Sequence, residues 1–386
     1  KKPNAGNDRF RVGTSRSDSK KRRDTASNIG ITTVSDDLLA RQMEKFDYDH
    51  LPQSIRSERN PQTKREKAIE WMVENILAVH DALPKEVRER AAQWYDGASK
   101  LANKLAKKYK YTKVQTAGVI AVLSPQNGWF KNASQAEKVI DIYANHRNEV
   151  IDPKIHGEAM ELIISKAQAA QSAKKKVVEG ETPRQKALRQ AYNRRLDEQK
   201  RDQRRAIMEG ITGYTINQLG KIDSEPQSWA LRVLATHYWS SEYNVLSPEG
   251  DILWVQRKNP TKAQLRAGEE GSPSTHGWGS AQEIGNAIAI LKNGSLENLH
   301  RILGNEHKVR SFFNNIVAPN SAMGDVTMDT HAVAAAHLMP WGISAIAVDH
   351  NFGGRGIPNS KQFKTGRRDR ASACKRGKKK FKLSSI

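Results

Sequence analysis

The chain has 386 residues, of which 64 are Lys or Arg, 42 are Asp or Glu and one is Cys. At roughly 150 residues per domain, this length is enough for about two domains with their own cores. A single cysteine excludes a disulfide framework, a cysteine-based zinc site and a four-cysteine iron–sulfur cluster. No run approaches the ~18 consecutive apolar residues that a membrane span needs.

The net charge is +22, and three basic segments account for it: residues 1–23 carry +7, residues 171–208 carry +7 and residues 361–386 carry +10, while the rest of the chain carries −2. This layout favours a polyanionic partner, because each phosphate that a Lys or Arg neutralises releases condensed counterions. We therefore predict double-stranded DNA as the partner. An anionic membrane is less favoured, because the tails lack apolar residues to insert. For the internal segment alone, a solvated helix face is an equal alternative.

The N-terminal half reads as a disordered tail followed by helices. Residues 1–33 have almost no apolar residues, which predicts disorder. Further on, apolar residues recur at three- and four-residue spacing, which predicts helices. The expected helices are Ala68–Val79, Val87–Ala98, Leu101–Tyr109, Val114–Val122 and one from about Asn132 to His146. Ser124-Pro125 ends the fourth of these, because proline breaks or caps a helix.

The second half continues the helical pattern with one charged insertion. Residues 166–210 are rich in Ala, Gln and Arg and lack a broad apolar face, so we expect a long projecting helix, or a pair interrupted near Gly180–Pro183. Residues 211–245 look helical, and residues 246–278 read as a loop with one short strand at Ile252–Val255. Helices then resume at Gln282–Lys292, Leu296–Leu303, Lys308–Val317 and His331–Leu338. With strand signals nearly absent, the predicted fold class is all-α.

Two segments carry the residues that chemistry would need. The first is an apolar helix that ends in the polar turn Ser124–Asn132. The second has a glycine turn at Gly304, Lys308 at a helix start, and Asp329 at a helix N-cap position 21 residues later. A carboxylate placed beside an ammonium group is a common way to activate an amine.

These segments resemble the helix-hairpin-helix DNA glycosylases, the superfamily that includes endonuclease III. Ser124-Pro125-Gln126 is similar to the turn whose Gln enters the DNA, Leu303–Lys308 to the hairpin, and Met328–His331 to the element that supplies the catalytic Asp. A group of tailed-phage proteins of unassigned activity is closer still, through Trp94–Ala98, Ser247–Gly250 and Gly277–Ser280.

The resemblance implies a phage-encoded, two-lobed glycosylase-like enzyme that acts on a flipped base in DNA and needs no cofactor. Asp329 would stabilise positive charge at the sugar anomeric carbon, and Lys308 would form a Schiff base that permits strand cleavage. The expected location is the host-cell cytoplasm, with the virion as a second one. The implied DNA-facing residues are Gln126, Asn127, Trp129, Asn132, Gly304, His307, Arg310 and His331.

The same resemblance divides the chain into parts. We expect a basic disordered tail (1–33), N-terminal helices of a first lobe (34–112), a glycosylase-like lobe (113–322) interrupted by the basic insertion (166–210), the catalytic Asp element with a closing helix (323–350), and a basic C-terminal tail (351–386).

The chain departs from the family at two places. The hairpin glycines are reduced to Gly304-Asn305-Glu306, which weakens the expected backbone cradle for a phosphate. The iron–sulfur cysteines are missing, in keeping with the lone Cys374. An amine attacks at neutral pH only if burial or a cationic neighbour favours its uncharged form, and His307 and Arg310 are the neighbours in sequence. No histidine spacing predicts a metal site.

Several alternatives stay open at this point. Asp329 could serve only as a helix N-cap, and the Gln126–Trp129 turn could be a satisfied polar turn. Two other functions compete with base excision. The first is a thymine-hypermodification enzyme of the same superfamily, and the second is a non-catalytic DNA-binding or packaging protein.

Overall fold

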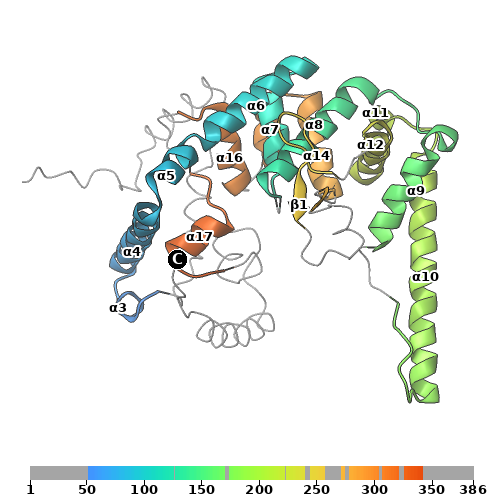
Figure 1. Cartoon of the computed structure of the whole chain (residues 1–386), viewed down its shortest axis with the longest axis horizontal. Coiled ribbons are helices and arrows are strands. Elements are labelled where there is room, and N and C mark those ends of the chain that lie inside the picture. The colour runs from blue at the N-terminus through green and yellow to red at the C-terminus, as the bar shows by residue number, and fades with distance from the viewer. Residues whose placement is uncertain are drawn as a thin grey trace, which may run out of the picture. The chain divides into compact units, whose positions relative to one another are not determined.

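The computed structural model describes residues 51–125, 127–169, 174–221, 223–239, 244–256, 271–273, 278–303, 307–320 and 326–341. Within these ranges the protein is all-α, with a single two-stranded sheet (Figure 1). The predicted fold class is confirmed. Both predicted tails lie outside the described residues. None of the described helices is long and apolar enough to span a membrane.

The chain divides into two compact units, Lys1–Asp96 with Gly304–Ile386 and Gly97–Leu303. In the described part of the first unit, the helices are α3 (Gln53–Arg56), α4 (Pro61–Ala82), α5 (Lys85–Ala92), the start of α6 (Trp94–Tyr109), α16 (His307–Val317) and α17 (Thr330–Ala336). The second unit holds the rest of α6, α7 (Lys113–Val122), α8 (Trp129–His146), α9 (Pro153–Ala169), α10 (Pro183–Ile211), α11 (Ile216–Leu219), α12 (Ser224–Tyr238), α14 (Ala281–Lys292) and α15 (Leu296–Leu303).

In the first unit, α4 packs against α17. The Asn60 side chain caps α4 by accepting from the backbone N–H groups of the next turn, and Pro61 takes the first helical position, where its missing N–H costs no hydrogen bond. Asn75 Nδ2 donates to the Ala336 carbonyl at 2.8 Å, and the Trp71 ring meets the His337 ring edge-on at 5.7 Å. These contacts fix the helix that follows Asp329.

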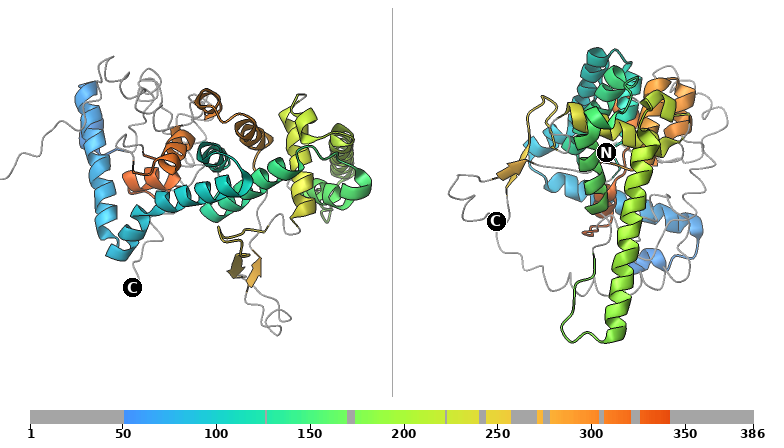
Figure 2. Two further views of the ribbon diagram at one scale, coloured as in Figure 1. Left: turned by 90° about the horizontal axis from the view of Figure 1, so that it is seen from above. Right: turned by 90° about the vertical axis from the view of Figure 1, so that its right-hand side faces the viewer.

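In the second unit, α7 is the central helix and packs against α8 and α14. A capping box between Thr112 and Gln115 starts it, and Thr116–Val122 are all buried. Gly118 allows the close approach of α14 and α15, because a Cβ there would lie 2.9 Å from Leu299 Cδ2 and 3.1 Å from Ile290 Cγ2. Figure 2 shows the helices of this unit from two further sides.

The only strands among the described residues are β1 (Trp254–Gln256) and β2 (Gly271–Pro273). They pair antiparallel, with Trp254 opposite Pro273. The sequence predicts one strand at Ile252–Val255, and the structure places β1 at the end of that range and a single bridge from Leu246 to Ile252 before it.

Two helix predictions need correction, and one helix is absent from the predictions. The apolar stripe expected to run unbroken from Val87 to Ala98 is divided at Gln93, where the backbone leaves the helix, and α6 continues from Trp94 to Tyr109. Among the described residues of the 211–245 segment, helix is found at the end of α10 and in α11 and α12, because Gly213 takes a φ of 81° and Asp223 caps a new helix. Helix α9 is not predicted. Its start does carry a signal, because Asp152 directly precedes the helix and accepts a hydrogen bond from Lys154 N.

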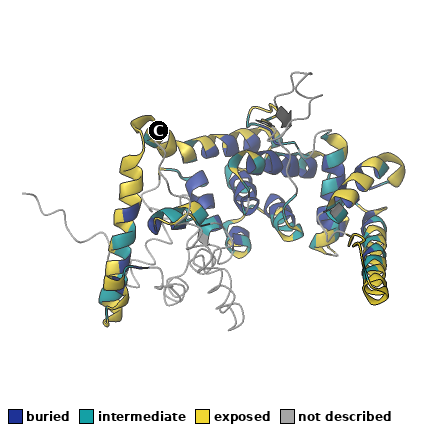
Figure 3. Cartoon of the chain, turned by 60° about the horizontal axis from the view of Figure 1, so that its bottom comes forward, coloured by how far each residue is buried: buried dark blue, intermediate teal, exposed yellow. Residues whose placement is uncertain are grey.

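The charged insertion is not one helix from residue 166. A non-helical segment, residues 174–182, here called the strap, precedes helix α10. Helix α10 starts at Pro183, next to the predicted interruption, where Thr182 and Gln185 form a capping box. The preceding described residues, 174–182, are not helical. Helix α10 packs against α9 and α12, and in Figures 1 and 2 its N-terminal part projects beyond the other helices of its unit. Exposed residues cover much of its length (Figure 3).

Candidate nucleic-acid interface

The predicted DNA-entering turn connects α7 to α8, and its polar side chain Asn127 is bound within the protein. Asn127 N donates to the Ser124 carbonyl at 3.2 Å. Its Nδ2 donates to the Leu123 carbonyl at 2.8 Å and to Gln135 Oε1 at 3.1 Å. Gln126 lies outside the described residues. The structure therefore gives Asn127 the satisfied-turn geometry that the sequence left open.

Trp129 and Asn132 start α8 and differ in exposure. Trp129 is partly buried. Asn132 is only 2% exposed, and its Oδ1 has no hydrogen-bond partner among the described residues. The structure therefore places Asn132 in the interior of its unit, away from the surface that a duplex backbone would touch.

Next to this turn lies a polar cluster that sequence reasoning missed: Gln135, which accepts from Asn127 in the turn, with Gly279 and Arg232 beside it. Gln135 is fully buried, and its Nε2 faces Gly279, where an added Cβ would lie 3.4 Å away. Arg232 Nη2 donates to the Gly279 carbonyl at 2.8 Å. Within the described ranges, Gln135 Nε2 and Ser228 Oγ are buried without a hydrogen-bond partner. Since buried polar atoms are usually bonded, this cluster retains capacity for hydrogen bonding.

Lys308 and Asp329 both lie in the first unit, at the starts of consecutive helices. Lys308 is the second residue of α16 and is partly buried. Asp329 is the N-cap of α17, and its Oδ1 accepts from Ala332 N at 2.8 Å. Asn315 Nδ2 on α16 donates to Thr327 Oγ1 at 3.1 Å and so joins that helix to the Asp329 segment.

The described structure shows no ion pair between Lys308 and Asp329. Lys308 is near the start of α16 and Asn315 is near its end. The two residues are seven positions apart, which is about 10 Å along the helix axis. The two groups therefore stand on connected elements without being bonded to each other.

The remaining predicted residues are placed differently. Arg310 is 4% exposed inside α16 and is therefore not a surface group. His331 is exposed on the first turn of α17. Gly304 and the side chain of His307 lie outside the described residues. Among the residues the structure describes, no group of three or more His, Cys, Asp or Glu could hold a metal ion.

The basic insertion forms a surface, here called the arm, made of the strap 174–182 and α10. Several of its basic side chains are held by acids: Arg189 bonds Glu181 at 2.8 Å, Lys174 bonds Asp197 at 2.8 Å, and Arg204 pairs with Glu161. A further set of basic residues makes no ion pair in the described part of the chain: Arg184, Lys186, Arg194, Arg195 and Arg201. These are the groups available to a polyanion.

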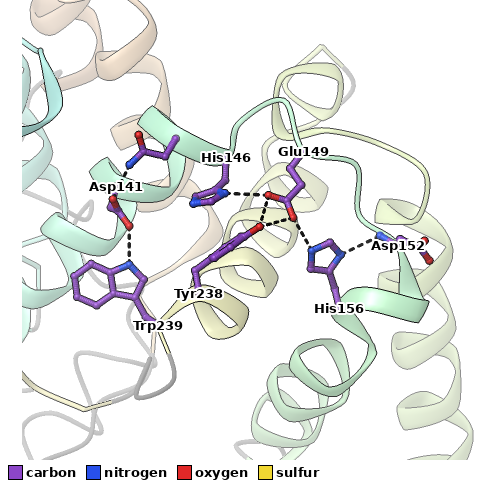
Figure 4. A network of polar contacts seen from close by, with 8 residues as sticks. Asp141, His146, Glu149, Asp152, His156, Tyr238 and Trp239 are labelled. Atoms are coloured by element: carbon purple, nitrogen blue, oxygen red, sulfur yellow. Dashed lines mark hydrogen bonds and ion pairs between the residues drawn. The ribbon is translucent and has the colours of Figure 1, made fainter.

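A second polar network, which the sequence did not predict, surrounds Glu149 (Figure 4). The Tyr238 hydroxyl donates to both carboxylate oxygens of Glu149, at 2.8 and 2.7 Å. His146 Nδ1 and His156 Nε2 each lie 2.9 Å from the same carboxylate. His156 is fully buried and its Nδ1 accepts from Asp152 N at 3.1 Å, so its hydrogen is on Nε2.

The network joins the end of α8, the start of α9 and the end of α12. Burial by itself would raise the pKa of Glu149, but hydrogen bonds from Tyr238, His146 and His156 outweigh it and hold that pKa below its usual value. Burial and the bond to Glu149 raise the pKa of Tyr238 to about 12. The His146 ring also stacks on the Tyr238 ring at 3.6 Å. A carboxylate that accepts this many bonds serves to hold the three helices together.

The comparisons with known proteins give one finding. A model described as a family of unknown function (DUF7178) matches residues 58–186. That range includes the Ser124–Asn132 turn, Glu149 and the strap, and it excludes Lys308 and Asp329. The searches of curated proteins and of solved structures give no match.

Proposed function

We propose that this protein binds double-stranded DNA and acts, in the manner of a glycosylase, on a nucleotide flipped out of the duplex. The observation that supports this proposal best is the position of Asp329. One carboxylate oxygen is fixed by Ala332 N, while no described residue donates to the other. The cap therefore orients the carboxylate and leaves an oxygen for a substrate.

The proposed chemistry uses the charge of that carboxylate. When the bond between base and sugar breaks, the base leaves with the bonding electrons and positive charge develops at the anomeric carbon. A preorganised negative group stabilises this charge in the transition state. Water, or the Lys308 amine, then attacks the carbon and loses a proton, while the departing base takes up a proton. When the amine attacks, the bond between the anomeric carbon and the ring oxygen then breaks, the ring oxygen gains a proton, and the resulting Schiff base permits strand cleavage.

The test is a panel of damaged and modified duplexes incubated with the whole protein, with products identified by mass spectrometry. In parallel, borohydride is added to reduce any Schiff base to a stable protein–DNA bond. We expect release of one base and a trapped complex that Lys308→Gln abolishes. The matched control is Lys292→Gln, at the end of α14. Base release by a protein that is never trapped indicates a glycosylase without lyase activity.

A non-catalytic DNA-binding or packaging protein is the second candidate. Two observations favour it: Asp329 already serves as a helix cap, and Lys308 forms no ion pair with it in the described structure. Tight duplex binding with no product from any member of the panel would select this function. A product in which a base gains a group would instead select the hypermodification enzyme.

A further inference from the structure

The free end of the arm, residues 174–195, is held in a defined shape. The Lys175 backbone N–H donates to Asn193 Oδ1 at 2.9 Å, and the Lys175 carbonyl accepts from Asn193 Nδ2 at 3.1 Å. Farther along, Arg189 donates to both Glu181 oxygens, at 2.8 and 2.9 Å. The Lys175 ammonium lies 4.6 Å above the Tyr192 ring. These contacts fasten the strap to α10, so the end of the arm presents a preformed surface.

That surface combines exposed apolar side chains with positive charge. Val177, Val178 and Leu188 are 73%, 65% and 64% exposed. The same segment, residues 174–195, has eight basic residues against two acidic ones, Glu179 and Glu181, and Glu181 is already bound to Arg189. Exposed apolar side chains in a basic segment can add apolar contacts to the binding of a polyanion.

We propose that the end of the arm binds across a groove of duplex DNA, with Lys and Arg on the phosphates and the Val177–Val178 step against the groove. This inference shares its partner with the proposed function and concerns a surface separate from Lys308 and Asp329. Arg184 and Arg195 are eleven residues, about 16 Å, apart along the helix. That span exceeds the ~12 Å width of the major groove, so the two can reach phosphates on opposite strands.

The composition favours DNA over a membrane. Helices that lie on anionic membranes bury aromatic and Leu side chains several ångströms deep. Here the exposed apolar set is three aliphatic side chains without an aromatic residue, of the kind that contacts thymine methyl groups in the major groove. The excess of Lys and Arg over acids matches a partner with one phosphate charge per ~1.7 Å of duplex axis.

The test compares two four-residue variants that remove the same charge from the full-length protein. The first is Arg184→Gln, Lys186→Gln, Arg194→Gln and Arg195→Gln. The control is Lys100→Gln, Lys107→Gln, Lys110→Gln and Lys154→Gln, all exposed in the same unit outside the arm. Affinity for a 20-base-pair duplex is measured by fluorescence anisotropy over a series of salt concentrations. Far-UV circular dichroism and the melting temperature show that each variant folds.

We expect the arm variant to reduce the slope of log affinity against log salt by about 0.9 for each phosphate that the protein no longer neutralises, and the control to reduce it by less than about 0.9 in total. A second variant, Val177→Ser with Val178→Ser, should weaken binding several-fold and leave the slope unchanged, because it removes apolar surface without removing charge.

Equal slopes for the arm and control variants would overturn the proposal. The proposal would also be overturned if the arm variant, but not the control, lost binding to phosphatidylserine vesicles while its DNA binding stayed intact. That result would assign the arm to a membrane. Because only binding is measured, the result holds whether or not the protein proves to be an enzyme. Loss of base release in Asp329 variants with normal DNA affinity would concern the reaction alone.

Discussion

At the scale of single residues, Asp329 carries the enzymatic proposal. Asp329→Asn keeps a side-chain oxygen that can cap α17 but removes the negative charge. We expect the variant to fold with a similar melting temperature and to release base at least 10²-fold more slowly, which corresponds to about 3 kcal/mol of transition-state stabilisation. The rate is measured in single turnover on the duplex that the unmodified protein processes.

Asp223→Asn is the matched control, because Asp223 is also a helix N-cap and accepts from Glu225 N at 3.3 Å. It should leave the rate of base release unchanged. If Asp329→Asn is as active as the unmodified protein, Asp329 is a cap and nothing more, and the glycosylase assignment is wrong.

Glu149 gives a prediction about pH. Its pKa lies below the usual value in the folded protein, so its contribution to stability is complete above the unfolded pKa and disappears as the pH falls through the folded one. We expect Glu149→Gln to lower the free energy of unfolding at pH 7 by about 1.5–3 kcal/mol, the usual range for hydrogen bonds to a charged group. Below pH 5, the free energy of unfolding should fall less steeply with pH than in the unmodified protein. Urea unfolding at several pH values measures both.

The control for Glu149 is Glu158→Gln on α9, an exposed residue with no ion pair among those described. It should change neither the free energy of unfolding at pH 7 nor the decline of that free energy below pH 5. If the free energy of unfolding declines equally below pH 5 in Glu149→Gln and in the unmodified protein, the network does not depend on the carboxylate charge.

At the scale of helices and strands, apolar spacing predicts well where a helix packs on a core. It gives α14, α15 and α16 to within one residue of their observed ends, because one face of each is buried. It fails for the strap 174–182, whose shape depends on tertiary hydrogen bonds from Asn193 and Arg189. It also divides α5 and α6 at the wrong place, since the apolar stripe continues across Gln93 and only the backbone shows the break.

Substitution of two helical glycines by alanine distinguishes the effect of packing on stability from the effect of helix propensity. Gly118→Ala places a Cβ 2.9 Å from Leu299 Cδ2, and overpacking of this kind costs about 1–3 kcal/mol. Gly97 lies in α6 with no atom within 4 Å of an added Cβ, so Gly97→Ala should raise stability by up to about 1 kcal/mol through helix propensity. Thermal unfolding of both variants checks the pair. A stabilising Gly118→Ala would show that α7 and α14 are less closely packed than described.

At the scale of the whole molecule, the sequence shows where charged and capping residues lie along the chain, but it does not show which distant residues contact them in the fold. It identifies the charged insertion, and it identifies Asp329 from a helix-start pattern. It does not find Glu149, because its partner Tyr238 lies 89 positions away in the chain. It does not find Gln135 either: its bonded partner Asn127 is close in sequence, but the sequence does not show that Gln135 is fully buried. The family resemblance implies that Asn132 and Arg310 face the DNA, whereas both are buried, because a motif match does not show how deep a polar side chain lies.

The last prediction concerns the two terminal segments, residues 1–23 and 361–386, which together carry +17 of the net charge of +22. If they bind phosphates, a protein without them keeps the helicity of its body but binds duplex more weakly, with a salt dependence flattened by about 0.9 log unit for each phosphate left without its cation. A full-length variant with every Lys and Arg of both segments changed to Gln controls for length. It should match the deletion, since the charge and not the chain is responsible. If both proteins keep the original salt slope, the terminal segments serve a partner other than DNA, and the arm binds the phosphates without them.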